Sequence, residues 1–236
     1  CYAQNIVVPE SAPYVLPDTI SFNDAVSLPN LQLAIALMQA ASPGHSPTPG
    51  TVLITGAAGG VATMLSQVAR YYGFKTIGTA RTSEKRAFAL STGFDVILDA
   101  NPLTLVEEVM SATNGLGVNL VYDHLGGAFF PQCIRSLAPL GLAISYNIIT
   151  GKPNEDVFGI LRELLGKSLA VRCFSMHTFD EDKNNRRNLM LNAIDLMSNG
   201  HVKAPSSVVM NFSQVTQAHE ILDQGLTLGK IVLKPH

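Results

Sequence analysis

The sequence has little cysteine, no tryptophan and few charges: 3 cysteines, no Trp and 14% charged residues in 236. Cys1, Cys133 and Cys173 are far apart and form no C-x-x-C pair, and the histidines show no metal-ligand spacing. This pattern argues against both a zinc site and a disulfide framework. We therefore expect no bound metal and a reducing, cytoplasmic environment.

Long apolar runs and a strong charge bias are also missing. The net charge is −2, which gives no basic field to attract nucleic acid. No run approaches the roughly 20 apolar residues that a membrane span needs, and no signal peptide is visible. These absences favour a soluble protein with a small-molecule partner. Because residue 1 is cysteine rather than methionine, we expect that upstream residues were removed or never included.

What the sequence does have is 47% hydrophobic residues, enough for a full core, in a regular alternation of strand and helix patterns. Nearly continuous apolar strands that alternate with helices predict a parallel sheet covered on both faces. The expected fold class is α/β, a doubly wound Rossmann sheet. The strands are predicted at 51–56, 75–80, 95–99, 118–126, 141–149 and 169–176, with helices at 61–73, 83–93, 103–115, 129–139 and 157–167.

The two ends of the chain do not follow this alternation. A strand is predicted at 2–9, then a helix cap at Ser21 or Asn23 and a later apolar helix reaching about Ala41, then a turn-rich connector at 42–50. After residue 181 we expect a helix at 182–200, an extended stretch at 206–212, a helix capped by Ser213 and a final strand at 230–235.

A glycine-rich turn follows the first strand of the alternating region. In "TGAAGGVA" the glycines Gly56, Gly59 and Gly60 allow a sharp turn and close approach of a pyrophosphate, which would lie on the N-terminus of the next helix. Ala62 stands where a last glycine usually allows close packing of helix on strand. The alternative reading as a short-chain dehydrogenase, with Tyr71 and Lys75 as a Y-x-x-x-K pair, fails because that pair lies on a much later helix in that family.

Several segments together resemble the zinc-independent quinone oxidoreductase and enoyl reductase branch of the medium-chain dehydrogenase/reductase superfamily. They are "YAQNIVVP", "LPDTISFNDAVSLP", "VLITGAAGGVA", "TIGTARTSEKRAFALSTGFDVI", "GVNLVYDHLGG", "LAPLGLAISY" and "AHEILDQGLTLGKIVLKP". The resemblance implies that residues 1–17 end a GroES-like substrate domain, that 18–176 form the dinucleotide-binding domain, and that 177–236 complete the substrate domain.

The resemblance also implies metal-free hydride transfer from NADPH to a quinone or an α,β-unsaturated carbonyl. It implies a homodimer through edge strands of the nucleotide-binding domain, with 141–149 and 169–176 as the candidate edges. The absence of Asp or Glu after the second strand, where "TARTSEK" stands instead, favours NADP over NAD. The expected cofactor-binding residues are Gly56, Ala58, Gly59, Gly60, Val61, Arg81, Lys85, Asp123, Tyr146 and Asn147.

The sequence departs from the family's pattern at Ala34, Asp99, Asn147 and Gly225, all at positions expected near the cofactor. A second hypothesis is therefore a Rossmann scaffold with lost or remodelled redox activity, acting as a redox-neutral biosynthetic enzyme or a binding subunit. A third is a protein that truly starts near Cys1 and lacks the rest of its substrate domain. Asp123 and His124 end a strand at the ligand-binding edge of the sheet, so they are candidates for a catalytic acid/base pair. The sequence pattern assigns no catalytic residue.

Overall fold

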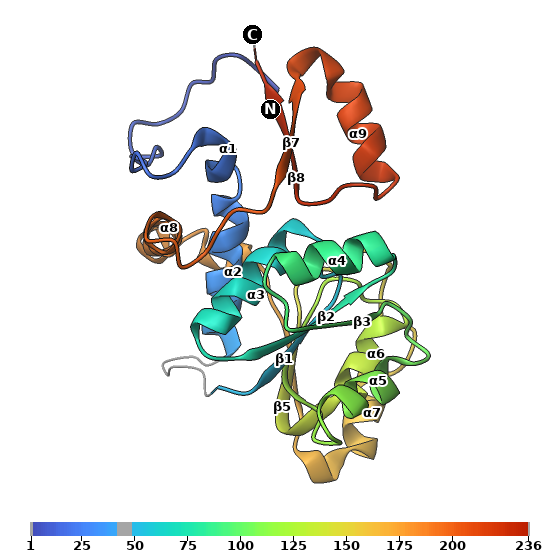
Figure 1. Cartoon of the computed structure of the whole chain (residues 1–236). Coiled ribbons are helices and arrows are strands. Elements are labelled where there is room, and N and C mark those ends of the chain that lie inside the picture. The colour runs from blue at the N-terminus through green and yellow to red at the C-terminus, as the bar shows by residue number, and fades with distance from the viewer. Residues whose placement is uncertain (1, 42–48, 236) are drawn as a thin grey trace.

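The computed structural model describes residues 2–41 and 49–235. Its centre is a six-stranded sheet with the order β3-β2-β1-β4-β5-β6, in which every neighbouring pair is parallel. This is the predicted doubly wound fold (Figure 1). The strands are β1 (Thr51–Ile54), β2 (Lys75–Ala80), β3 (Val96–Asp99), β4 (Val118–Asp123), β5 (Leu137–Ser145) and β6 (Ala170–Cys173).

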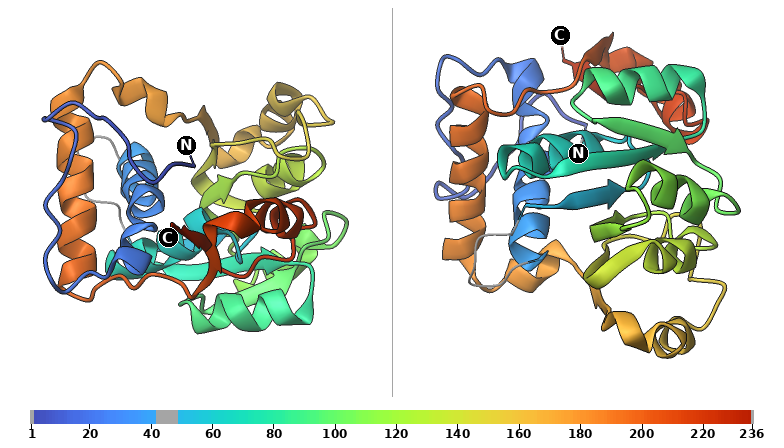
Figure 2. Two further views of the ribbon diagram at one scale, coloured as in Figure 1. Left: turned by 90° about the horizontal axis from the view of Figure 1, so that it is seen from above. Right: turned by 60° about the horizontal axis from the view of Figure 1, so that its bottom comes forward.

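Side chains that alternate along each strand create two separate cores. In β1, Val52 and Ile54 enter the core on one face of the sheet, and Leu53 enters the core on the other. The first core packs against α2 (Leu28–Ala41), α3 (Gly60–Tyr71), α4 (Ser83–Ser91) and α8 (Lys183–Ser198). The second packs against α5 (Leu105–Ala112), α6 (Phe129–Arg135) and α7 (Val157–Glu163), on the opposite side of the sheet in Figure 2.

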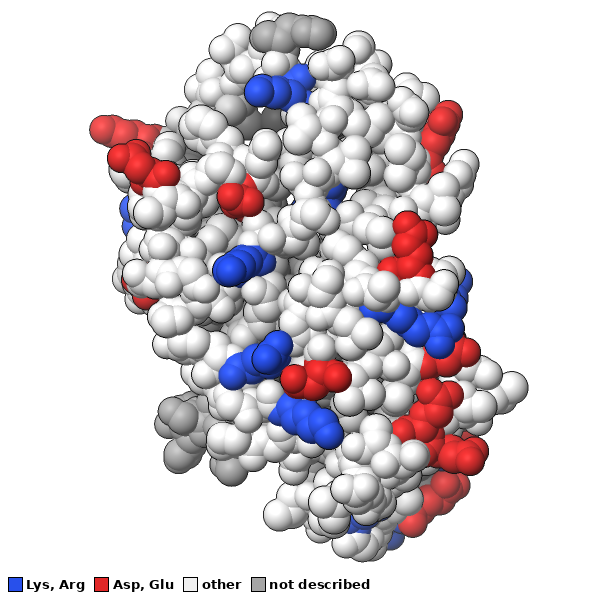
Figure 3. Space-filling view, in the orientation of Figure 1, with Lys and Arg blue, Asp and Glu red and all other residues white. Residues whose placement is uncertain are grey.

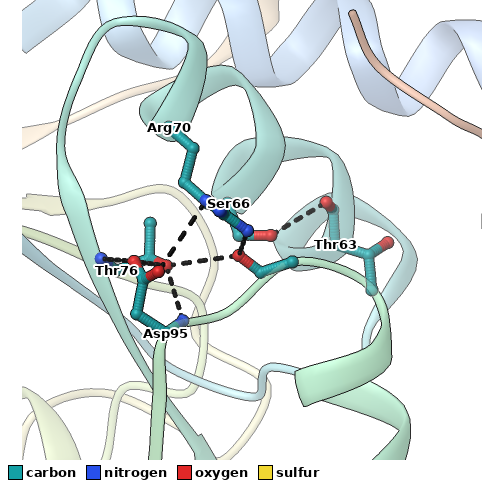
Figure 4. Close-up of polar contacts among 6 residues, drawn as sticks. Thr63, Ser66, Arg70, Thr76 and Asp95 are labelled. Carbon is teal, nitrogen blue, oxygen red and sulfur yellow. Dashed lines mark hydrogen bonds and ion pairs between the residues drawn. The ribbon is translucent and has the colours of Figure 1, made fainter. Parts of the chain in front are cut away.

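A polar cluster fixes the β3 side of the sheet to α3. The carboxylate of Asp95 accepts hydrogen bonds from the amide and the hydroxyl of Thr76, at 2.8 and 2.9 Å. Arg70 on α3 lies 3.8 Å from the same carboxylate and also donates to the carbonyl of Gly93 at 3.0 Å. Figure 4 shows these side chains converging between helix and strand. These contacts therefore hold the loop before β3 against β2 and α3.

The C-terminal segment begins with α8, which belongs to the first core. Helix α8 packs beside α2, and the chain then forms a parallel pair, β7 (Ser207–Asn211) and β8 (Lys230–Lys234), joined by α9 (Val215–Asp223). The side chain of Gln67 on α3 bonds twice with the backbone of Lys203, donating at 3.0 Å and accepting at 2.8 Å. This segment is thus attached directly to the helix that follows β1.

Three expectations about local structure were wrong. Residues 2–9 form no strand and are exposed, and the nearby strands β7 and β8 pair only with each other. Ser213 caps no helix: Asn211 and Gln214 form a reciprocal capping box there instead. Residues 141–149 are not an edge, because β5 lies between β4 and β6.

Other local expectations were confirmed or lie outside the structure. Ser21 accepts a hydrogen bond from the amide of Asp24 and caps the short helix α1 (Phe22–Ala25). Of the predicted connector, residues 42–48 lie outside the described residues.

On the face drawn in Figure 3, basic and acidic side chains are scattered over a mostly uncharged surface. Within 2–41 and 49–235, no helix combines the length and apolar character that crossing a membrane requires.

Candidate cofactor and active site

A buried carboxylate organises the carboxyl ends of β1 and β4, where the winding of the sheet reverses. Asp123 ends β4 and is fully buried. It accepts hydrogen bonds from the hydroxyl of Thr55 at 2.7 Å and from the amides of Gly126 at 2.8 Å and Leu125 at 3.2 Å. Burial raises the pKa of Asp123, and these hydrogen bonds oppose the rise. Asp123 therefore shapes both loops of the switch point without facing the open space above them.

The glycine turn leaves β1 beside this carboxylate. Gly56 has a φ of 61°, a left-handed conformation that glycine adopts without strain, and its amide donates to the hydroxyl of Thr79 at 3.2 Å. Gly59 is the N-cap of α3 and has no side chain to bond the first amides of the helix. A Cβ on Gly60 would lie only 2.5 Å from the side-chain nitrogen of Asn30. The turn thus presents bare backbone to the space above it.

Two adjoining clefts open above the turn. The β2-side cleft has a volume of about 430 Å³, and the β5-side cleft about 290 Å³. Both are bordered by Gly59, His124 and Ile149. The β2-side cleft is also lined by Gly56, Ala58, Thr79, Ala80, Arg81, Lys85, Ala100, Leu125, Leu222, Gly225 and Thr227, and the β5-side cleft by Leu33, Gly60, Val61, Ala62, Tyr146 and Asn147.

The β2-side cleft is positively charged. Arg81 follows the end of β2 and Lys85 lies in the first turn of α4, and no Asp or Glu is among the described residues that line the cleft. The ammonium group of Lys85 donates to the carbonyl of Gly225 at 2.6 Å, which joins α4 to the segment after α9. Asp99, the nearby acid at the end of β3, lies 3.5 Å from Arg86. The cleft can therefore receive an anion.

The β5-side cleft has a mostly apolar lining. Tyr146 contributes an aromatic ring, and burial raises the pKa of its hydroxyl, which stays protonated at neutral pH. The side chain of Asn147 accepts a hydrogen bond from the amide of Ile148 at 2.8 Å. Ala34, expected near this region, is fully buried in the core, and its neighbour Leu33 lines the cleft instead.

The structure brings most of the predicted cofactor residues to the two clefts. Asp123 is the exception, since it lies beneath them. Sequence reasoning missed Leu33, Leu125, Leu222 and Thr227, which no motif distinguishes because ordinary side chains reach the clefts through the path of the chain. The backbone path is itself fixed, since the amide of Ile149 donates to the carbonyl of His124 at 3.1 Å.

Comparison with known proteins places this geometry in a family. Residues 60–196 match the family model described as zinc-binding dehydrogenase. The chain is 30% identical over 233 residues to a hybrid PKS-NRPS synthetase of Aspergillus niger, covering 97% of this chain and 6% of that protein. It is 25% identical over 233 residues to a quinone oxidoreductase-like protein 2 homolog of Nematostella vectensis, covering 98% of this chain and 63% of that protein. The chain thus spans less than two thirds of the length of either relative.

A solved structure agrees with these relatives. The quinone oxidoreductase of Escherichia coli, complexed with NADPH, superposes with a TM-score of 0.79 at 27% identity, covering 94% of this chain and 68% of that chain. Among the described residues no three His, Cys, Asp or Glu side chains are grouped to hold a metal. The chain belongs to the zinc-binding dehydrogenase family, in the quinone oxidoreductase and enoyl reductase branch of the medium-chain dehydrogenase/reductase superfamily.

Proposed function

We propose that this protein is an NADPH-dependent, zinc-independent oxidoreductase that transfers hydride to a quinone or an α,β-unsaturated carbonyl compound. The observation that carries the proposal is the pair of cations in the β2-side cleft. Arg81 and Lys85 stand where an NAD-specific site would carry an acid for the ribose hydroxyls. A 2′-phosphate suits two cations, and an acid in their place would repel it.

The clefts fit a dinucleotide in shape and in polarity. In this proposal Arg81 and Lys85 hold the 2′-phosphate, the turn at Gly56, Gly59 and Gly60 receives the pyrophosphate, and the β5-side cleft receives the nicotinamide. Asn30 supports the fit, because its side chain approaches the turn so closely that a Cβ at position 60 would displace it. When bound, NADPH supplies the hydride.

The chain itself contributes positioning and a dry environment. Leu33 and Ile149 present apolar side chains to the β5-side cleft, and Tyr146 closes part of its wall. An apolar wall excludes water from the reacting carbon and holds a planar unsaturated substrate against the nicotinamide ring. The proposal assigns no residue as a proton donor and rests on the orientation of the substrate.

Direct titration with NADPH and with NADH tests the proposal. We expect NADPH to bind, and Lys85→Met to weaken its Kd about tenfold by removing a charge-assisted contact, with little effect on NADH. Lys75→Met is the matched control, because Lys75 is exposed at the opposite end of β2. A folded wild-type protein that binds no NADPH contradicts the proposal. Equal losses in the Lys85 and Lys75 variants would remove its main support.

A second candidate function is a dinucleotide-binding scaffold without hydride transfer. It is favoured by Asn147, whose side chain borders the smaller cleft, where a small residue would leave more room for nicotinamide. Asn147→Gly should then raise the NADPH oxidation rate with a quinone or enone acceptor. If the wild type already oxidises NADPH with such an acceptor, this second candidate fails.

The remaining expectations are proposals of the same kind. We propose a homodimer that pairs through β6, the edge strand that residues 169–176 supply. We also propose that the division at residues 17 and 176 separates parts of a substrate domain from the nucleotide domain. A cytoplasmic location is proposed from the free thiols of Cys133 and Cys173.

A further inference from the structure

His124 occupies the junction between the two clefts. It is the first residue after β4 and borders both the β2-side and the β5-side cleft. Its imidazole rests directly on the glycine turn: a Cβ added to Gly56 would collide with the ring's Cε1 and lie 2.8 Å from its Nε2. Any ligand that extends from one cleft into the other must therefore pass the imidazole.

The protein itself leaves part of this imidazole unused. Nδ1 of His124 is buried and has no hydrogen-bond partner among the described residues. The adjacent carboxylate of Asp123 is already occupied by Thr55, Leu125 and Gly126. Because Nδ1 is closed off from the clefts, the nitrogen that a ligand there can reach is Nε2, which lies beside the glycine turn.

The surroundings of the imidazole favour an anionic partner. Arg81 and Lys85 are the charged side chains lining the β2-side cleft, and the ring of Tyr146 lies 5.7 Å from the imidazole across the β5-side cleft. The first turn of α3 contains no acidic residue, and its N-cap Gly59 has no side chain to bond the helix amides. The adjacent acid, Asp123, directs its oxygens away from the clefts, toward the hydroxyl of Thr55 and the amides of Leu125 and Gly126.

We propose that His124 donates a hydrogen bond to the pyrophosphate joining the two halves of the bound dinucleotide, and that protonation of His124 strengthens this contact. The inference rests on the proposed function, because it assumes that the ligand spans both clefts. It adds a side-chain contact to the backbone amides of the glycine turn. It also makes affinity for the cofactor dependent on pH in the physiological range.

The direction of the pH dependence follows from the two states of the site. In the free protein burial lowers the pKa of His124, so the imidazole is neutral. A bound pyrophosphate favours the imidazolium and raises that pKa in the complex. Binding therefore takes up a proton between the two pKa values. Affinity rises as the pH falls through the value in the complex, and levels off below the value in the free protein.

Comparing the wild type with His124→Gln tests the inference, because glutamine donates a hydrogen bond but does not titrate. The Kd for NADPH is measured by its fluorescence at about pH 8 and about pH 6. We expect the acid-induced tightening to be about tenfold greater in the wild type than in His124→Gln. Titration of the cofactor's own 2′-phosphate affects both proteins and cancels in this comparison.

The fragment 2′-AMP is the control ligand, since it carries the 2′-phosphate but has no phosphate on the 5′ side, where the bridging pyrophosphate begins. It should bind both proteins equally at each pH, which also shows that the variant is folded. His124→Ser is a second variant, for use if His124→Gln is unstable. Equal pH dependence in wild type and variant overturns the inference. Tighter NADPH binding by the variant at both pH values also overturns it, because the imidazole would then obstruct the cofactor site. If the wild type binds neither ligand, the proposed function fails as well.

Discussion

At the scale of single residues, Asp123 shows how one buried group can set the geometry of a site that it does not face. Its two oxygens hold Thr55 at the end of β1 and the amides of Leu125 and Gly126 after β4. These contacts keep the two loops of the switch point together. The clefts above therefore depend on Asp123 for their shape, even though Asp123 lines neither of them.

Asp123→Asn should consequently destabilise the protein. Asparagine keeps one acceptor but directs an NH₂ group at one of the donors, so we expect the free energy of unfolding to fall by about 1–3 kcal/mol. Asp156→Asn, at the exposed N-cap of α7, is a control for the loss of a carboxylate. Chemical denaturation at neutral pH measures both. A loss no greater than that of the control would contradict the role assigned to Asp123.

The pH dependence of this difference has a definite sign. Burial raises the pKa of Asp123 above 3.8, so its contribution to stability is full below that ordinary value and is lost as pH rises through the folded-state value. Asparagine at position 123 does not titrate. The stability difference between wild type and Asp123→Asn should therefore grow as the pH falls from neutral toward 3.8, in denaturation curves recorded across that range. A difference that shrinks on acidification would contradict this assignment.

Single residues also show where sequence reasoning stopped. The motif around Gly56 and the cations Arg81 and Lys85 could be placed in the site from the pattern alone, because a strand, a turn and a helix fix their positions. The bond between Lys85 and the carbonyl of Gly225 could not be predicted, since it joins residues 140 positions apart. The position of His124 over Gly56 likewise depends on how two loops pack.

At the scale of elements, strand and helix periodicity predicted the central sheet because its inner strands β1, β2, β4 and β5 are largely buried by their neighbours. The same reasoning failed at residues 2–9, where an apolar pattern exists but the segment pairs with no strand. The family resemblance offered 141–149 as one of two candidate edges, which only the strand order can decide. Local pattern thus identifies an element, and tertiary pairing decides whether and where it forms.

Helix α3 provides a prediction at this scale. Ala62 is buried in its first turn, in the core between helix and sheet. Ala62→Gly removes a buried methyl and raises the flexibility of the helix, so we expect a loss of about 1–2 kcal/mol in the free energy of unfolding. NADPH affinity should change little, because Ala62 borders the β5-side cleft only with a single methyl group and lies after the pyrophosphate turn. Ala87→Gly, on the exposed face of α4, should lose only the helix-propensity part. A lost affinity with unchanged stability would show that Ala62 acts on the ligand instead.

At the scale of the whole molecule, the C-terminal segment is attached to the central sheet at two levels. Helix α8 contributes buried side chains to the first core, and Leu222 of α9 and Gly225 after this helix line the β2-side cleft. The polar contacts of Gln67 with Lys203 add to this attachment. A ligand in the β2-side cleft would therefore touch both the sheet and the returning segment, and its binding should stabilise their contact.

The edge of the sheet gives the last prediction. In the parallel sheet, β6 pairs with β5 on one side only, and its residues are mostly exposed, which invites pairing with a second copy of the chain. Ala170→Lys adds a long, charged side chain to this edge and should convert a dimer into a monomer of 25.2 kDa in sedimentation experiments. Leu116→Lys introduces the same charge at an exposed position before β4, away from β6, and should leave the dimer intact. If the wild type is monomeric, or if both variants dissociate equally, β6 is not the dimer edge, since the effect would then not depend on where the charge was placed.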